Sequence, residues 1–182
     1  MVTTGKGGRT LRDTSEILDG TDRDSFQGWV DKLQLQELLA VLASAVDRGD
    51  QERVTSCYAE ESYDDHGVFQ GSGREFAEYV CNQPTPPGFK MHHLLGQSVF
   101  DVRGDEAWGE TFFIYNETSD AGTHSGFGRF VDYFQRIESR WKVKYRRVVA
   151  DSTVEGYDIS TYWASSRDRD DPAYDHRTWP DG

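Results

Sequence analysis

The chain has 182 residues, of which 36% are hydrophobic and 13% aromatic, and its formal net charge is −12. This length and composition suit one domain with a sizeable core. The negative charge argues against nucleic acid or an anionic membrane surface as a partner, because both bind basic surfaces. No segment approaches the ~18 consecutive apolar residues of a membrane span, and no signal-peptide pattern opens the chain. We therefore expect a cytoplasmic protein that acts on a small molecule.

The first half of the chain predicts three helices and one strand. Residues 1–24 are rich in Gly, Thr and charge without sustained periodicity, which indicates a flexible tail. Apolar residues then recur at helical spacing up to Gly49, where a helix can stop, and Asp50 can cap the next helix. Ser72 and Glu75 have the spacing of a capping box. The predicted elements are helices over 25–50, 51–61 and 71–83, with a strand over 62–69.

The second half predicts a run of strands after Gly88. The four predicted strands cover roughly 90–102, 107–117, 126–138 and 141–152. Helices followed by hairpin-connected strands predict an α+β fold, in which a cone-shaped, curved antiparallel or mixed sheet wraps around helices and encloses a pocket. We expect one domain over 25–152. The segment 153–182 carries several aromatic residues, which predicts docking on the domain or on a neighbouring subunit.

Short motifs carry a resemblance to a known family. They are "AVDRGD" at the end of the long helix, "CYAEESYDDHGVFQG" entering the first strand, "MHHLLGQ", and "GRFVDYFQR" followed by "RWKVKYRRVV" on the last hairpin. Over about 33–152, the chain resembles the SnoaL-like branch of the nuclear transport factor two-like superfamily. That branch includes polyketide cyclases, and close to it are scytalone dehydratase, hexachlorocyclohexane dehydrochlorinase and bile acid dehydratase. The resemblance implies the cone-shaped fold, which hosts many chemistries and some proteins that are not enzymes.

The resemblance also implies site residues. In the eliminating relatives, an Asp near the end of the long helix orients a His of the sheet, and this His removes a proton from the substrate. The matching positions are Asp47 and His93, and an Arg that assists the departing group in the dehydrochlorinase corresponds to Arg146. Gln97 stands where the family often has Asn, and the acidic pair of "YDDHG" is absent from the best-known dehydrochlorinase and dehydratase. The substrate is therefore not implied.

The histidine pair of "MHHLLGQ" raises the question of which ring faces the pocket. A neutral His is a good proton acceptor near pH 7, and a carboxylate on its other ring nitrogen stabilises the imidazolium. Asp47 suits that role, although it is also typical of a solvated turn. If His93 faces inward, alternation places Leu95 and Gln97 beside it, and Gln97 can bind a substrate oxygen. The opposite register would place His92 inside.

The segment "SYDDHGVF" offers two alternating faces. Tyr63 and Asp65 share one face, and Asp64 and His66 share the other. We expect Tyr63 to face inward and to bind a carbonyl or an enolate. Asp65 is expected to bind a substrate hydroxyl, to bind His93 or to lie in the pocket as a second acid. The acidic residues equally suit a solvated sheet edge. A role for His66 as a second acid–base group stays open.

The later strands supply the remaining candidates. Thr111 and Phe113 share one row and are expected to line the pocket, and Phe130 is a pocket wall in the register of the family. An inward Arg146 needs a carboxylate, for which Asp132 on the paired strand is a candidate. A purely structural ion pair between these two residues is the alternative.

These residues predict a lyase that uses no cofactor and no metal. Adjacent histidines on a strand cannot hold one ion from one face, and no phosphate-binding loop or nucleophile motif occurs. The favoured reaction is dehydration of a small, oxygenated and largely apolar substrate, with His93 as the base. A polyketide-type cyclase or a double-bond isomerase would share the first step, whereas a binding or assembly module would need no carboxylate behind the histidine. Relatives of this type favour a homo-oligomer, a trimer before a dimer.

Overall fold

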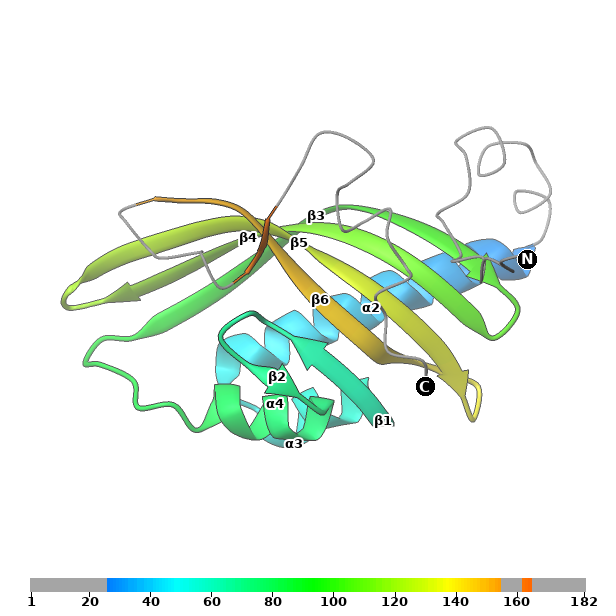
Figure 1. The fold of residues 1–182 in the computed structure, drawn as a ribbon, viewed down its shortest axis with the longest axis horizontal. Coiled ribbons are helices and arrows are strands. Elements are labelled where there is room, and N and C mark those ends of the chain that lie inside the picture. Colours follow the sequence, from blue (N-terminus) through cyan, green and yellow to red (C-terminus); the bar gives the residue numbers. More distant parts are fainter. Residues whose placement is uncertain (1–25, 155–161, 165–182) are drawn as a thin grey trace, which may run out of the picture.

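The computed structural model describes residues 26–154 and 162–164 (Figure 1). The described helices are α2 (Phe26–Arg48), α3 (Gln51–Cys57) and α4 (Gly73–Cys81). The described strands are β1 (Tyr58–Asp65), β2 (Gln70–Gly71), β3 (Lys90–Arg103), β4 (Glu106–Ser119), β5 (Gly122–Ile137), β6 (Arg140–Val154) and β7 (Trp163–Ala164). The predicted tail and most of the predicted C-terminal extension lie outside these residues. None of the described helices is both long and apolar enough to cross a membrane.

The strands form one mixed sheet with the order β2-β1-β6-β5-β4-β3. Both β1 and β7 run parallel to β6, whereas the other neighbours are antiparallel. The four long strands β3 to β6 follow one another as hairpins, as predicted. Figure 1 shows the sheet curving over α2, with α3 and α4 close to β1 and β2. This arrangement confirms the predicted α+β class with a curved sheet around helices.

Local sequence signals set the helix ends. Gly49 has a φ of +64°, a conformation that costs glycine little, and it follows the last turn of α2. The Asp50 side chain then accepts the backbone N–H of Arg53 at 3.1 Å and caps α3. Ser72 and Glu75 form a reciprocal capping box at the start of α4. All three predicted signals are confirmed.

The second helix is shorter than the predicted range of 51–61. Helix α3 ends at Cys57, and residues 58–61 begin β1. Tyr58 is extended, with φ −93° and ψ 153°, and it pairs with Val143 of β6. Its ring is buried and packs edge-on against Phe76 at a centroid distance of 6.1 Å. Strand pairing and burial of the aromatic ring therefore outweigh the helical pattern of this segment.

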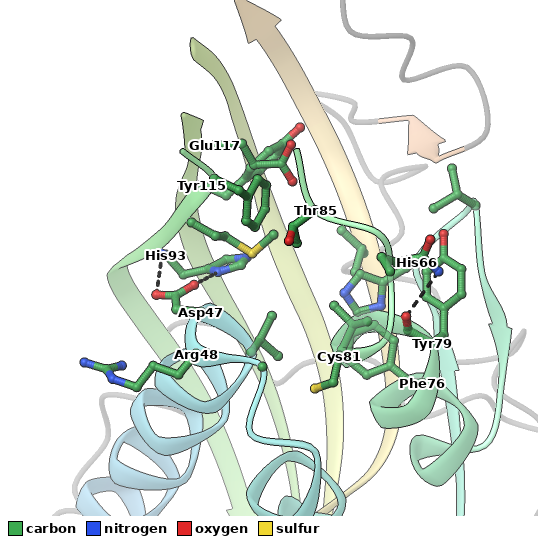
Figure 2. Close-up of a pocket in the computed structure, with 18 of the residues that line it drawn as sticks. Asp47, Arg48, His66, Phe76, Tyr79, Cys81, Thr85, His93, Tyr115 and Glu117 are labelled. Atoms are coloured by element: carbon green, nitrogen blue, oxygen red, sulfur yellow. Dashed lines mark hydrogen bonds and ion pairs between the residues drawn. The ribbon is translucent and has the colours of Figure 1, made fainter. Parts of the chain in front are cut away.

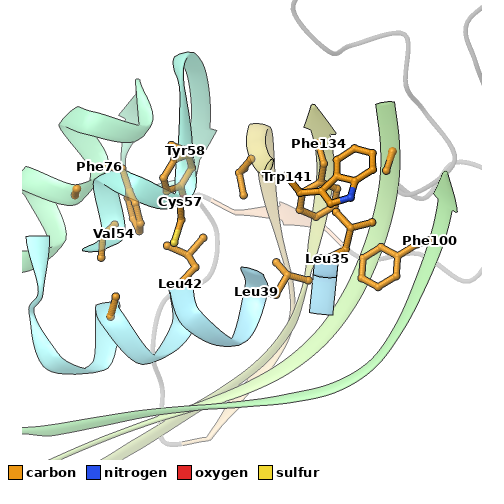
Figure 3. Packing of buried hydrophobic residues seen from close by; sticks show 14 residues of the cluster. Leu35, Leu39, Leu42, Val54, Cys57, Tyr58, Phe76, Phe100, Phe134 and Trp141 are labelled. Carbon is orange, nitrogen blue, oxygen red and sulfur yellow. The ribbon is translucent and has the colours of Figure 1, made fainter. Parts of the chain in front are cut away.

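Helix α2 buries one face against the concave side of the sheet (Figure 3). Leu35, Leu39 and Leu42 are each at most 2% exposed and belong to one core cluster with Phe134 and Trp141. Their spacing follows the helical period, so that the three leucines share one stripe. This packing fixes the end of α2, which carries Asp47, against the sheet.

Replacing Gly73 with alanine is expected to destabilise the fold by about 1–3 kcal/mol, because a Cβ at this position would overlap Cβ, Cγ and Cδ1 of Tyr58. These atoms lie close to the backbone of Tyr58, so a change of side-chain rotamer cannot relieve the overlap. Urea unfolding of Gly73→Ala measures the loss. Gly96→Ala is the matched control, since its Cβ would meet Phe112 at an ordinary 3.5 Å. An unchanged free energy of unfolding for Gly73→Ala would contradict this packing.

The convex face of the sheet exposes a row of apolar side chains. Leu94, Ile114 and Phe127 are register neighbours on β3, β4 and β5, and each is at least 37% exposed. Such a row suits a contact between subunits. The predicted homo-oligomer stays a prediction, and this face is where its contact would be sought.

Candidate active site

A pocket of about 620 Å³ lies between the end of α2, helix α4 and the concave face of β3 to β5 (Figure 2). Its volume is in the range of small-molecule sites. Aromatic and aliphatic side chains make up most of its lining, with a few polar groups among them. Four predicted site residues line it, and these are Asp47, His93, Phe113 and Phe130.

Asp47 and His93 are joined by two hydrogen bonds. Asp47 Oδ1 lies 2.6 Å from His93 Nδ1, and Asp47 Oδ2 accepts the backbone N–H of His93 at 2.9 Å. The two side chains are 13% and 15% exposed, respectively, so the pair lies at the edge of the cavity and largely out of water. A carboxylate that accepts from Nδ1 leaves Nε2 of the neutral ring as a proton acceptor. Of the two adjacent histidines, His93 lines the pocket and His92 is exposed.

The electrostatics of the pair favour the ionised form of Asp47. Burial opposes the charge on Asp47, but the side-chain and backbone hydrogen bonds from His93 outweigh it, so that the pKa of Asp47 lies below its ordinary value of 3.8. The carboxyl group is therefore ionised near neutral pH. An imidazolium formed on His93 would meet this negative charge directly.

Aromatic rings surround His93 on the pocket side. Its ring centroid lies 6.1 Å from that of Phe113, 6.2 Å from that of Tyr115 and 6.5 Å from that of Phe130. Phe113 and Phe130 stack on each other at 4.2 Å. The cavity thus offers flat apolar walls beside the histidine, and substrate binding by these two phenylalanines stays a prediction.

A second histidine, His66, lies across the pocket from His93 (Figure 2). Its Nδ1 forms a hydrogen bond with Oδ1 of the fully buried Asp64. Asp64 Oδ2 accepts the hydroxyl of Tyr58 at 2.5 Å. The imidazole stacks on Phe76 at 4.3 Å. The structure therefore places two histidines in one pocket, each with a carboxylate behind Nδ1.

Tyr63 and Asp65 lie on the other side of the sheet, so their predicted inward orientation is wrong. Tyr63 stacks on Tyr145 at 5.7 Å, and Asp65 accepts the indole N–H of Trp163 at 2.9 Å. Neither residue lines the pocket. Alternation from Tyr63 to Asp65 holds, but the inward face is the one that carries Asp64.

A β-bulge in β3 moves Gln97 out of the predicted row. The register with β4 shifts between Leu95 and Ser98, which adds a residue to this strand and interrupts the alternation. Gln97 is exposed and does not line the pocket. The predicted inward orientation of Gln97 is therefore wrong.

Arg146 is buried behind the pocket wall and is not part of it. Its Nε and Nη2 donate to Oδ1 and Oδ2 of Asp132, both at 2.8 Å, which confirms the predicted pair. The Cζ atom lies 3.9 Å from the ring centroid of Phe130, and Phe130 lines the cavity. The ring therefore separates the guanidinium from the pocket, and Arg146 does not reach a departing group. Thr111 is also outside the lining, because its hydroxyl is buried and donates to Ser98 at 2.9 Å.

Several lining residues escaped prediction. Tyr79 and Cys81 come from α4, Thr85 from the connection to β3, and Glu117 from β4. Glu117 could have been found by continuing the alternation of β4 two steps past Tyr115. The others carry no pattern, because their positions depend on how α4 packs across the sheet.

Two described residues of the C-terminal extension contact the domain. Tyr162 lines the pocket, and Trp163 stacks on Arg147 at 3.8 Å from its Cζ atom. Docking of the whole extension on the domain or on a neighbouring subunit stays a prediction, because residues 155–161 and 165–182 lie outside the described residues.

A curved sheet wrapped around helices, with a pocket at one end, defines the nuclear transport factor two-like fold. Within that fold, the family model for the SnoaL-like domain matches residues 29–147. The chain belongs to this family. No curated protein matches the sequence.

Solved structures share the fold. A protein of unknown function from Mycobacterium tuberculosis, Rv3472, is 25% identical, with 69% of this chain and 74% of that chain covered and a TM-score of 0.60. A proposed scytalone dehydratase from Novosphingobium aromaticivorans is 15% identical, with coverages of 74% and 93% and a TM-score of 0.64. A type 2 hexachlorocyclohexane dehydrochlorinase, LinA, is 16% identical, with coverages of 76% and 93% and a TM-score of 0.62.

Proposed function

We propose that the protein is a cofactor-independent lyase that removes water from a small, oxygenated and largely apolar substrate. His93, held by Asp47, takes a proton from the carbon beside a carbonyl group, and the hydroxyl on the next carbon departs. The names of two structural neighbours, a dehydratase and a dehydrochlorinase, support elimination as the class of reaction. The substrate class follows from the apolar pocket and its few polar groups.

The double hydrogen bond between Asp47 and His93 carries this proposal. It fixes the ring and its tautomer beside a cavity, which is the arrangement that general base catalysis needs. A module that only binds a ligand would have no use for a largely buried carboxylate behind a pocket histidine. This observation favours an enzyme over the binding-module alternative.

The preference for dehydration now depends on a different residue. Tyr63, Asp65 and Gln97, which were expected to bind oxygen atoms, lie outside the pocket. His66 lines the pocket and offers a ring nitrogen to a substrate oxygen. Cyclisation and isomerisation share the proton abstraction with dehydration, and the experiment must separate them.

The test uses the aldol adduct of benzaldehyde and acetone, a β-hydroxy ketone with one flat ring that gives benzalacetone when it loses water. In D₂O, the wild-type protein is expected to exchange the hydrogen on the α-carbon, measured by NMR, and to form benzalacetone, measured by absorbance. His93→Gln is expected to lose both activities, because glutamine is not a base. His92→Gln is the matched control, since the neighbouring ring is exposed on the other face.

Two results would count against the proposal. One is the absence of α-carbon exchange with the wild-type protein, and the other is a His93→Gln variant as active as His92→Gln. Exchange without benzalacetone would keep His93 as a base and point to an isomerase or a cyclase.

A further inference from the structure

Three charged side chains form one row across the sheet behind the pocket. Asp64 of β1 is the register neighbour of Arg146 of β6, and Arg146 is the register neighbour of Asp132 of β5. Each is at most 3% exposed. Arg146 donates hydrogen bonds to both oxygens of Asp132, and the hydrogen bonds of Asp64 are made to other partners.

Those partners of Asp64 are Tyr58 and His66. Burial raises the pKa of Tyr58 well above its ordinary value, so that its hydroxyl keeps its proton and donates it to Asp64 in a hydrogen bond. The described ionisable groups around His66 are thus the carboxylates of Asp64 and Asp132, the guanidinium of Arg146 and the neutral phenol of Tyr58. A buried carboxylate without a compensating charge is costly. The His66 imidazole, which contacts Asp64 through Nδ1, is the group beside this row that can carry a compensating positive charge.

The other edge of the His66 ring is open to the pocket. Its Nδ1 is used by Asp64, and no described residue bonds to its Nε2. The ring centroid lies 6.4 Å from that of Phe130, while the ring of His93 lies 6.5 Å from the same centroid. A substrate that rests on Phe130 can thus lie between the two imidazoles.

We propose that His66 is the general acid of this site and the partner of His93 in the reaction, an inference that rests on the proposed function. As the α-carbon–hydrogen bond breaks, its proton goes to His93 Nε2 and its electron pair becomes the new carbon–carbon double bond. The β-carbon–oxygen bond breaks with its electrons on oxygen, and His66 Nε2 gives this oxygen a proton, so that water leaves. Proton exchange with solvent then restores both rings.

The residues behind His66 act as positioning residues in this scheme. Asp64 fixes the ring through Nδ1, and Tyr58 holds Asp64 in place. Asp132 and Arg146 neutralise each other beside them. The need for an acid follows from the chemistry, because hydroxide is a poor leaving group unless it is protonated as it departs.

A comparison of two leaving groups tests the role of His66. The aldol of benzaldehyde and acetone loses water, whereas its acetate ester loses acetate, which needs no proton to depart. For His66→Gln, we expect dehydration to fall by about 10²-fold or more, while α-carbon exchange and loss of acetate stay near the wild-type rates. Retained loss of acetate also shows that the variant is folded. His92→Gln is expected to match the wild type with both substrates.

The outcomes separate this inference from the proposed function. Equal losses with both leaving groups, or unchanged dehydration, would overturn the acid role of His66 and leave His93 as the base. A wild-type protein that exchanges the α-hydrogen but never forms benzalacetone would also overturn it. If the wild type does not exchange the α-hydrogen at all, the proposed function fails, and the acid role fails with it.

Discussion

Replacing Asp47 with asparagine is expected to slow α-carbon exchange of the benzaldehyde–acetone aldol by about 10²–10⁴-fold. Both carboxylate oxygens of Asp47 accept hydrogen bonds from His93, one from Nδ1 and one from the backbone N–H. An amide has one oxygen, so asparagine must present its NH₂ group to one of these donors. Facing Nδ1, it would favour the tautomer with the proton on Nε2, which is no longer a base. If the NH₂ group faced the backbone N–H of His93, two donors would meet, and the strand and the His93 ring would be displaced.

The control for Asp47→Asn lies three residues away. Asp50→Asn changes a carboxylate in the same "DRGD" segment, but Asp50 caps α3 at the surface, where asparagine caps equally well. It is expected to exchange the α-hydrogen at the wild-type rate. Exchange by Asp47→Asn that equals that of Asp50→Asn would show that the carboxylate behind His93 does not contribute.

The same variant has a signature in acid. The pKa of Asp47 is lower in the folded protein than its ordinary value of 3.8, so ionised Asp47 stabilises the folded state above that pH. This contribution is lost as the pH falls through the folded-state pKa. Urea unfolding should therefore show a difference between wild type and Asp47→Asn that is constant near neutral pH and shrinks below about pH 4.

The sequence predicts elements well where the signal is local. The capping box of α4, the cap at Asp50 and the stop at Gly49 each depend on a few adjacent residues, and all are found. The error at the end of α3 has a distant cause, because Tyr58 pairs with β6 more than eighty residues further along the chain. Residues 58–61, taken by themselves, contain no information about that pairing.

The candidate site shows the same division between local and distant information. Alternation correctly separates Tyr63 and Asp65 from Asp64 and His66, but it does not say which face is inside. The parallel pairing of Asp64 with Arg146 decides the face, and no residue near "SYDDHGVF" reveals it. Gln97 fails for another reason, because the bulge after Leu95 is a feature of strand pairing that the sequence does not mark.

The largest loss of stability is expected when the ion pair between Asp132 and Arg146 is broken. Arg146→Met would leave the Asp132 carboxylate, which is 1% exposed, without its partner, and we expect a loss of about 3–5 kcal/mol in the free energy of unfolding. Burial opposes the charge on Arg146, but the attraction of Asp132 outweighs it and raises the pKa of Arg146. The guanidinium is therefore charged at every pH at which the protein would be studied, and urea unfolding near neutral pH measures the full effect.

A second substitution separates charge from packing. Asp132→Leu combined with Arg146→Met removes both members of the pair, and the remaining Asp64 keeps His66 as its counterpart. The double variant should be more stable than Arg146→Met alone, because hydrophobic residues often replace a buried ion pair without loss. Lys144→Met is the control on the same strand. Lys144 Nζ lies 3.7 Å from Oε2 of Glu61, whose side chain is 93% exposed. Because exposed ion pairs contribute little to stability, we expect a change below about 1 kcal/mol in the free energy of unfolding. A double variant less stable than Arg146→Met would mean that the pair is held for its shape, and the charge balance argued for His66 would lose its basis.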